Sequence, residues 1–180
     1  MAKSKVTRKQ KQLIDELDQL TELFDLDYWN IESYPEGAWT TFLELMKSKI
    51  VRSQIIIWYT LIDEFLNLRL SDFFYGTKRT TLKLWRTKKY KLLNYHVLEE
   101  LSLLQKLRFA RGIKPIPKKF VGRIERLNAV RNGIAHALFP ENLKKSSPVW
   151  NGLDVFSLDG AKALAQDIQE VIDYFVGRFE

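Results

Sequence analysis

Residues 39–76 have the sequence WTTFLELMKSKIVRSQIIIWYTLIDEFLNLRLSDFFYG, in which no proline or glycine occurs before Gly76. A segment of this length without helix breakers predicts one long helix, and the glycine after it is a typical C-terminal stop. The preceding residues 33–36, Ser-Tyr-Pro-Glu, have the pattern of a capping box with an early proline. That pattern predicts that the helix begins shortly after residue 33.

The middle of this segment, residues 55–59 with the sequence IIIWY, is apolar on every side of a helix. A helix of this kind is buried on several sides or lies at an interface between two copies of the chain. A short buried strand is the alternative for these five residues, because periodicity does not separate the two structures over so short a run.

Other segments have apolar residues at the spacings of three and four that indicate amphipathic helices. They are residues 8–26, 94–112 with Asn94 as the N-cap, 120–138 ending near Pro140, and 159–179. Residues 77–92 have no clear period and predict a basic connection, with a short helix around 82–85.

A small β-hairpin is expected before the last helix. Asn151-Gly152 lies between two short apolar strings within residues 149–156, which is the usual signal of a type I′ turn. The whole pattern predicts an all-α fold of about five helices with one hairpin. We expect a single domain over 1–180, with an N-terminal helical extension at 1–30 and a loop containing the hairpin at 139–157.

The composition of the 180-residue chain is that of a soluble globular protein, with 46% apolar and 28% charged residues. The sequence contains no cysteine, so disulfides, thiolate metal sites and cysteine nucleophiles are excluded. Its longest uncharged stretch, residues 53–62, is about half of the roughly 20 residues that a membrane span needs. We expect a cytoplasmic protein that is not embedded in a membrane.

Positive charge is concentrated in the middle of the chain, where residues 47–145 contain 22 basic and seven acidic residues. Within residues 73–98 there are seven basic residues and no acidic one. Such a block attracts polyanions, although a solvated loop facing the acidic ends of the chain is the alternative. The residues that we assign to RNA binding are Lys78, Arg79, Arg86, Lys88, Lys89 and Lys91.

The clearest candidate for chemistry is the segment from Arg131 to His136, with the sequence RNGIAH. On a helix Arg131 falls on the apolar stripe of residues 120–138, where an unpaired guanidinium is costly. Asn128, Asn132 and His136 follow one another at intervals of four along the flank of that stripe.

A purely structural interpretation of the same segment is open. In it, Arg131 pairs with a buried acid such as Asp63 or Glu64, and His136 helps to cap the end of the helix. His96, the other histidine, is interpreted as an ordinary surface or packing residue. The sequence has no phosphate-cradling glycine loop, nucleophile elbow or His-Glu-x-x-His motif, and no metal site or cofactor is expected.

The segment Arg131-Asn132-Gly133-Ile134-Ala135-His136 resembles the R-x(4–6)-H motif of HEPN domains, in which a polar residue often follows the arginine. The resemblance implies a helical bundle that dimerises and joins two motifs in a basic cleft, where RNA is cut without a metal. Many members are toxins or other defence effectors. It therefore implies a metal-independent endoribonuclease whose partners are RNA, a second copy of the chain and an antitoxin protein. Leu138 departs from the tyrosine that often follows the histidine by two positions in HEPN toxins paired with a nucleotidyltransferase antitoxin.

The residue types suit this chemistry. His136 can transfer protons near neutral pH, Arg131 is a permanent cation for the phosphorane, and Asn132 can orient the imidazole or a phosphate oxygen. Two alternative functions use the same residues for binding and not for catalysis. One is a HEPN-like dimeric module that binds RNA or a protein, and the other is a basic helical protein that binds nucleic acid.

Overall fold

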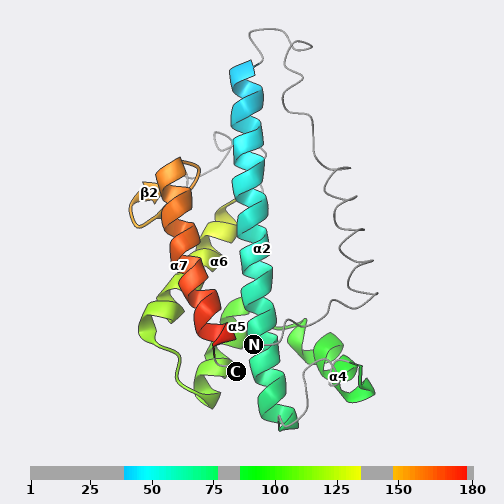
Figure 1. Ribbon diagram of the computed structural model, residues 1–180. Helices are drawn as coiled ribbons and strands as arrows, with labels where there is room; N and C mark the ends of the chain where they lie inside the picture. The colour runs from blue at the N-terminus through cyan, green and yellow to red at the C-terminus, as the bar shows by residue number, and fades with distance from the viewer. Residues whose placement is uncertain (1–38, 77–85, 135–147, 178–180) are drawn as a thin grey trace, which may run out of the picture. The chain divides into compact units, whose positions relative to one another are not determined.

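The computed structural model describes residues 39–76, 86–134 and 148–177, with side chains from residue 47 onward. The chain divides into two compact units, residues 1–42 and 43–180. Nearly all of the described residues, which Figure 1 draws as a ribbon, belong to the second unit. The predicted helix at 8–26, the capping box at 33–36 and the short helix at 82–85 lie outside the described residues. A single domain over 1–180 stays a prediction.

The long helix predicted from residues 39–76 is confirmed as α2 (Trp39–Tyr75). Gly76 follows the last residue of α2, has a φ of +61° and donates its N–H to the Asp72 carbonyl over 3.0 Å. The alternative of a buried strand at residues 55–59 is wrong. Ile55 and Ile62 are fully buried, whereas Ile56 and Ile57 are more than half exposed, so the segment is buried on one side only.

The helix predicted for residues 94–112 does not begin where the structure begins it. The chain forms α4 (Lys88–Leu93), continues as a π-helical segment η3 (Asn94–Leu98), and begins a separate helix α5 (Leu103–Ile113) after a turn. Asn94 is therefore not an N-cap: it has helical dihedral angles, and its Nδ2 donates to Glu99 Oε1 over 2.7 Å. The cap of α5 is Ser102, which forms a capping box with Gln105.

The prediction that residues 77–92 form a basic connection is wrong for residues 88–92, because these residues are helical in α4. Thr87 caps this helix by accepting the N–H of Tyr90 over 3.2 Å. The Tyr90 side chain is buried, and the Tyr75 hydroxyl at the end of α2 donates to the Lys89 carbonyl over 2.8 Å. These contacts with the rest of the fold give helical structure to a segment that has no amphipathic period of its own.

The remaining predicted elements are confirmed where they are described. The helix α6 (Lys118–Ile134) covers most of the predicted 120–138, and α7 (Leu158–Val176) begins one residue before the predicted start. Between them β1 (Val149–Trp150) pairs antiparallel with β2 (Leu153–Asp154). Asn151 and Gly152 have φ angles of 51° and 82°, as a type I′ turn requires.

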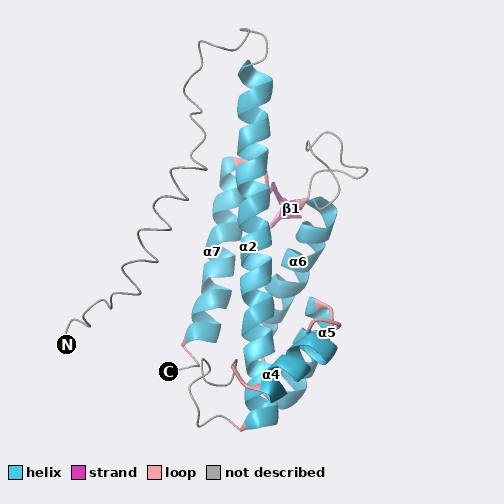
Figure 2. Ribbon diagram, turned by 90° about the vertical axis from the view of Figure 1, so that its right-hand side faces the viewer, coloured by secondary structure: helices cyan, strands magenta, loops and turns pink. Residues whose placement is uncertain are grey.

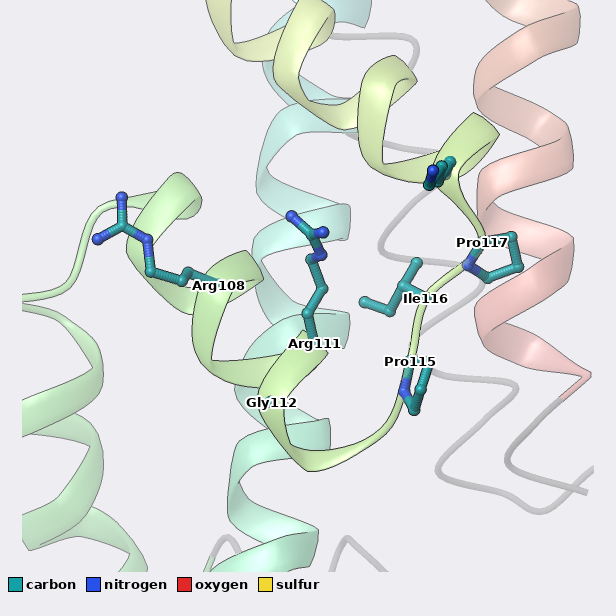
Figure 3. Close-up of a pocket in the computed structure, with 7 residues that line it drawn as sticks. Arg108, Arg111, Gly112, Pro115, Ile116 and Pro117 are labelled. Carbon is teal, nitrogen blue, oxygen red and sulfur yellow. The ribbon is translucent and has the colours of Figure 1, made fainter.

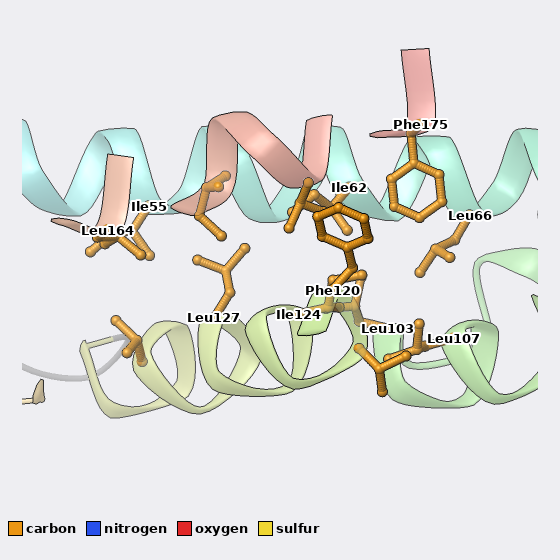
Figure 4. Packing of buried hydrophobic residues seen from close by; sticks show 14 of the residues in the cluster. Ile55, Ile62, Leu66, Leu103, Leu107, Phe120, Ile124, Leu127, Leu164 and Phe175 are labelled. Atoms are coloured by element: carbon orange, nitrogen blue, oxygen red, sulfur yellow. The ribbon is translucent and has the colours of Figure 1, made fainter. Parts of the chain in front are cut away.

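The helices α2, α5, α6 and α7 share one hydrophobic core, and Figure 2 shows α6 and α7 running beside α2. Each contributes fully buried side chains, including those of Ile62, Leu103, Ile124, Leu127 and Leu164 (Figure 4). Trp150 of the hairpin is also fully buried, and its indole N–H donates to Asp167 Oδ2 of α7 over 2.8 Å. The fold is therefore all-α with five α-helices in its described part and a hairpin before the last helix, as predicted.

Candidate functional site

Arg131 is partly buried near the C-terminus of α6, where Val130 and Ile134 of the same helix are buried. Its guanidinium carbon lies 5.1 Å from the centroid of the Tyr59 ring on α2. A guanidinium within about 6 Å of an aromatic centroid is attracted by the ring. The Tyr59 ring thus supplies a favourable contact for the charge that the sequence pattern places on the apolar stripe.

Asn132 is exposed and follows Arg131 in the last turn of α6. The Arg131 Nη1 donates to its Oδ1 over 3.3 Å. Asn128, one turn earlier, is partly buried. These two neighbouring residues of the motif are therefore in side-chain contact.

The purely structural interpretation of the motif pairs Arg131 with a buried acid such as Asp63. In the structure, Asp63 is instead paired with Lys106 of α5. The Lys106 Nζ lies 2.6 Å from Asp63 Oδ2, and the Lys106 side chain is only 4% exposed. Within the described part of the chain Arg131 forms no ion pair with Asp63, Glu64 or any other acid. The alternative pairing of Arg131 with Asp63 or Glu64 is therefore not formed, and Lys106 is a buried cation that the sequence pattern did not single out.

Tyr59 also lines a cavity of about 290 Å³ between α2 and α5, together with Asp63, Asn67 and Lys106. Burial raises the pKa of the Tyr59 phenol, and the Asp63 carboxylate raises it further. Arg131 and a backbone hydrogen bond with Leu103 act in the opposite direction. Because the net shift is upward from about 10, Tyr59 is a neutral phenol at physiological pH.

Arg52 of α2 is a second cation at the C-terminal end of α6, and no sequence pattern singles it out. Its Nη1 donates to the carbonyl of Ile134, the last residue of α6, over 3.3 Å. Its Nε donates to the buried Ser48 Oγ over 3.1 Å, and its guanidinium carbon lies 5.4 Å from the centroid of the Phe156 ring. A cation favours the C-terminus of a helix. Arg52 and Ile134 are 82 positions apart, so no local pattern predicts this contact.

His136 lies outside the described residues, as do Lys78 and Arg79. In sequence His136 follows Ile134 by two positions, directly after the end of α6 at which Arg52 and Arg131 are placed. The other histidine, His96, is exposed in η3, as expected for a surface residue.

The other residues predicted to bind RNA are at the start of α4. Arg86, Lys88, Lys89 and Lys91 are all exposed to solvent. Their backbone is fixed by the Thr87 cap and by the buried Tyr90 side chain. The structure thus presents four positive charges on an ordered segment.

The described residues contain no group of three or more histidine, aspartate or glutamate side chains that could hold a metal ion. No helix among them is long and apolar enough to cross a membrane. No known family, curated protein or solved structure matches the chain. The resemblance to HEPN domains therefore depends on the Arg131–His136 motif, whose first four residues form the end of α6.

Proposed function

We propose that this protein is a metal-independent endoribonuclease of the HEPN type, a prokaryotic toxin or defence effector that acts on cytoplasmic RNA as a homodimer. The observation that supports this most strongly is the placement of Arg131. The Tyr59 ring holds its guanidinium at the end of α6, where Arg52 adds a second positive charge. Arg131 precedes His136 by five positions, and Arg52 donates to the carbonyl of Ile134, two positions before His136. An antitoxin protein is a further partner of such a toxin.

The residues divide the chemistry of phosphodiester cleavage between them. His136 acts in proton transfer, as the base for the ribose 2′-hydroxyl or the acid for the leaving 5′-oxygen. Arg131 stabilises the charge that develops on the phosphorane, because a guanidinium binds phosphate oxygens in a bidentate manner and keeps its charge. Asn132 orients the imidazole or a phosphate oxygen. A homodimer supplies two histidines, one for each proton transfer.

The surface for the second copy is the exposed apolar edge of α2. Ile56 and Ile57 are 51% and 56% exposed. Ile56 follows Arg52 by four positions and precedes Tyr59 by three, so these three residues lie on one side of the helix. A second chain on this edge buries apolar surface directly beside the Arg131 site. A twofold axis there places the same surface opposite itself and brings the two motifs close.

Replacing Ile56 and Ile57 together with lysine is expected to convert the dimer into a monomer, because two buried charges disfavour the interface. Sedimentation velocity at micromolar concentration measures the change. Val176→Lys is the control, since Val176 is an exposed apolar residue of α7 outside this edge. A wild-type protein that is monomeric at micromolar concentration contradicts the proposal.

The cations of α4, with Lys78 and Arg79, bind the RNA backbone in this proposal. The side chains of Lys88, Lys89 and Lys91 are exposed on α4, and Arg86 is exposed two residues before this helix. Phosphate contacts of this kind position a strand without reading its sequence. We therefore expect them to contribute affinity and not base preference.

The reaction class is tested by incubating the purified wild-type protein with a defined RNA in EDTA. We expect cleavage to continue, because no step of the proposed reaction uses a metal. The products are expected to have 2′,3′-cyclic phosphate ends, since the 2′-hydroxyl is the nucleophile. Mass spectrometry of the fragments identifies these ends. An activity that EDTA abolishes and magnesium restores contradicts the mechanism, and the absence of any cleavage favours a non-catalytic binding module.

A further inference from the structure

The junction between α5 and α6 forms a second basic site, at the end of α6 opposite to Arg131. A pocket of about 750 Å³ lies there, lined by Arg108 and Arg111 of α5, by the connecting residues 115–117 and by Lys118, the first residue of α6 (Figure 3). Lys118 precedes Arg131 by 13 positions, which corresponds to about 20 Å along the helix axis. The pocket is therefore separate from the candidate active site.

The charges around this pocket have one sign. Arg108, Arg111 and Lys118 are all exposed, and no acidic residue is among those that line the pocket. Within the described part of the chain none of the three forms an ion pair. This sets them apart from Arg123 and Lys119 of α6, which both pair with Glu170. The pocket therefore presents positive charge that is not neutralised by described acids.

The wall of the pocket is fixed by the fold. Pro115 and Pro117 restrict the φ angles of the connection, and Ile116 between them is anchored in the core with 6% of its surface exposed. The Arg69 Nη2 donates to the Lys114 carbonyl over 2.6 Å, which ties the connection to α2. A site with an ordered backbone loses less conformational entropy when a ligand binds.

We infer that this pocket binds backbone phosphates of single-stranded RNA. Arginine side chains form bidentate, charge-assisted hydrogen bonds with phosphate oxygens. The apolar surface of the two prolines beside these cations suits the apolar faces of ribose and base. The identity of the strand rests on the proposed function, whereas the phosphate chemistry follows from the charges that line the pocket.

The inference is tested with a labelled 2′-O-methyl oligoribonucleotide of about 12 nucleotides, within the length that a single-strand-binding domain covers. This probe has no 2′-hydroxyl for attack, so binding is measured whether or not the protein is a nuclease. Fluorescence anisotropy gives the affinity of the wild type and of the Arg108→Gln/Arg111→Gln variant over a range of salt concentrations. We expect the variant to lower the log–log salt slope by up to about 1.4, which is about 0.7 for each lost phosphate contact.

Two further variants show whether position or total charge matters. Lys49→Gln/Lys162→Gln removes the same number of charges from exposed positions outside the pocket, and its slope is expected to stay near that of the wild type. Arg108→Lys/Arg111→Lys is expected to restore the slope, because lysine also releases counterions from phosphates. Circular dichroism checks that all variants are folded.

The inference is overturned if the Arg108→Gln/Arg111→Gln variant keeps the wild-type slope, or if the control variant loses the same amount. It is also overturned if inorganic phosphate or a mononucleotide competes as well as an unlabelled 12-mer, because the ligand is then a small phosphate and not a strand. If the wild type cleaves RNA but the Arg108→Gln/Arg111→Gln variant keeps the wild-type salt slope, only the pocket inference is refuted. Strand binding through the pocket without cleavage refutes only the nuclease proposal.

Discussion

Replacing His136 with alanine is expected to lower the rate of RNA cleavage by about 10²–10⁴-fold, the usual contribution of a positioned acid or base. The fold and most of the RNA affinity should be retained, because the change removes a proton-transfer group and leaves the cations in place. Single-turnover cleavage of a labelled RNA measures the rate, and anisotropy with the 2′-O-methyl oligonucleotide measures binding.

The chain contains its own matched control for this experiment. His96 is the only other histidine in the sequence, and it is exposed in η3. His96→Ala should therefore cleave RNA at the wild-type rate. Equal activity in the wild type and His136→Ala proteins would remove His136 from the mechanism. Equal losses in both histidine variants would point to a general effect on the protein.

The elements that were predicted correctly have signals within a few residues of one another. The long α2 follows from a segment without breakers that stops at Gly76, and the hairpin follows from the Asn151-Gly152 pair. The start of α5 had a local signal too, since Ser102 and Gln105 have capping-box spacing. Asn94 was the wrong choice because an asparagine is also tolerated inside a helix, here with its amide bonded to Glu99.

The features that were missed depend on contacts between distant segments. Residues 88–93 become helical where Tyr90 is buried and Tyr75 holds the Lys89 carbonyl. Arg52 enters the candidate site only because α2 and the end of α6 are adjacent in the fold. The sequence identified Arg131 as misplaced on its stripe, but the Tyr59 ring that accommodates it lies on another helix. Local patterns locate charges along an element, whereas the fold decides which of them meet.

Replacing Arg131 with alanine is expected to lower kcat by about 10²–10³-fold, as removal of one group that stabilises transition-state charge does. Unlike His136→Ala, this variant should also bind RNA more weakly, because the guanidinium contacts phosphate before the reaction as well as during it. The loss should therefore appear in both kcat and KM, which steady-state kinetics separates.

The role of the Tyr59 ring gives this prediction a sharper form. Arg131→Lys keeps the positive charge but loses the planar group that lies over the ring and binds phosphate in a bidentate manner, so it should restore only part of the activity. Arg126→Ala is the control on the same helix, because the Arg126 guanidinium also lies over an aromatic ring, that of Trp150 at 4.7 Å. Arg126 lies outside the motif, five positions before Arg131, and its Nη1 donates to Asn151 of the hairpin. Arg126→Ala should cleave RNA at close to the wild-type rate. If both alanine variants lose the same activity, the effect is a general one of charge or packing, and Arg131 has no special place in the reaction.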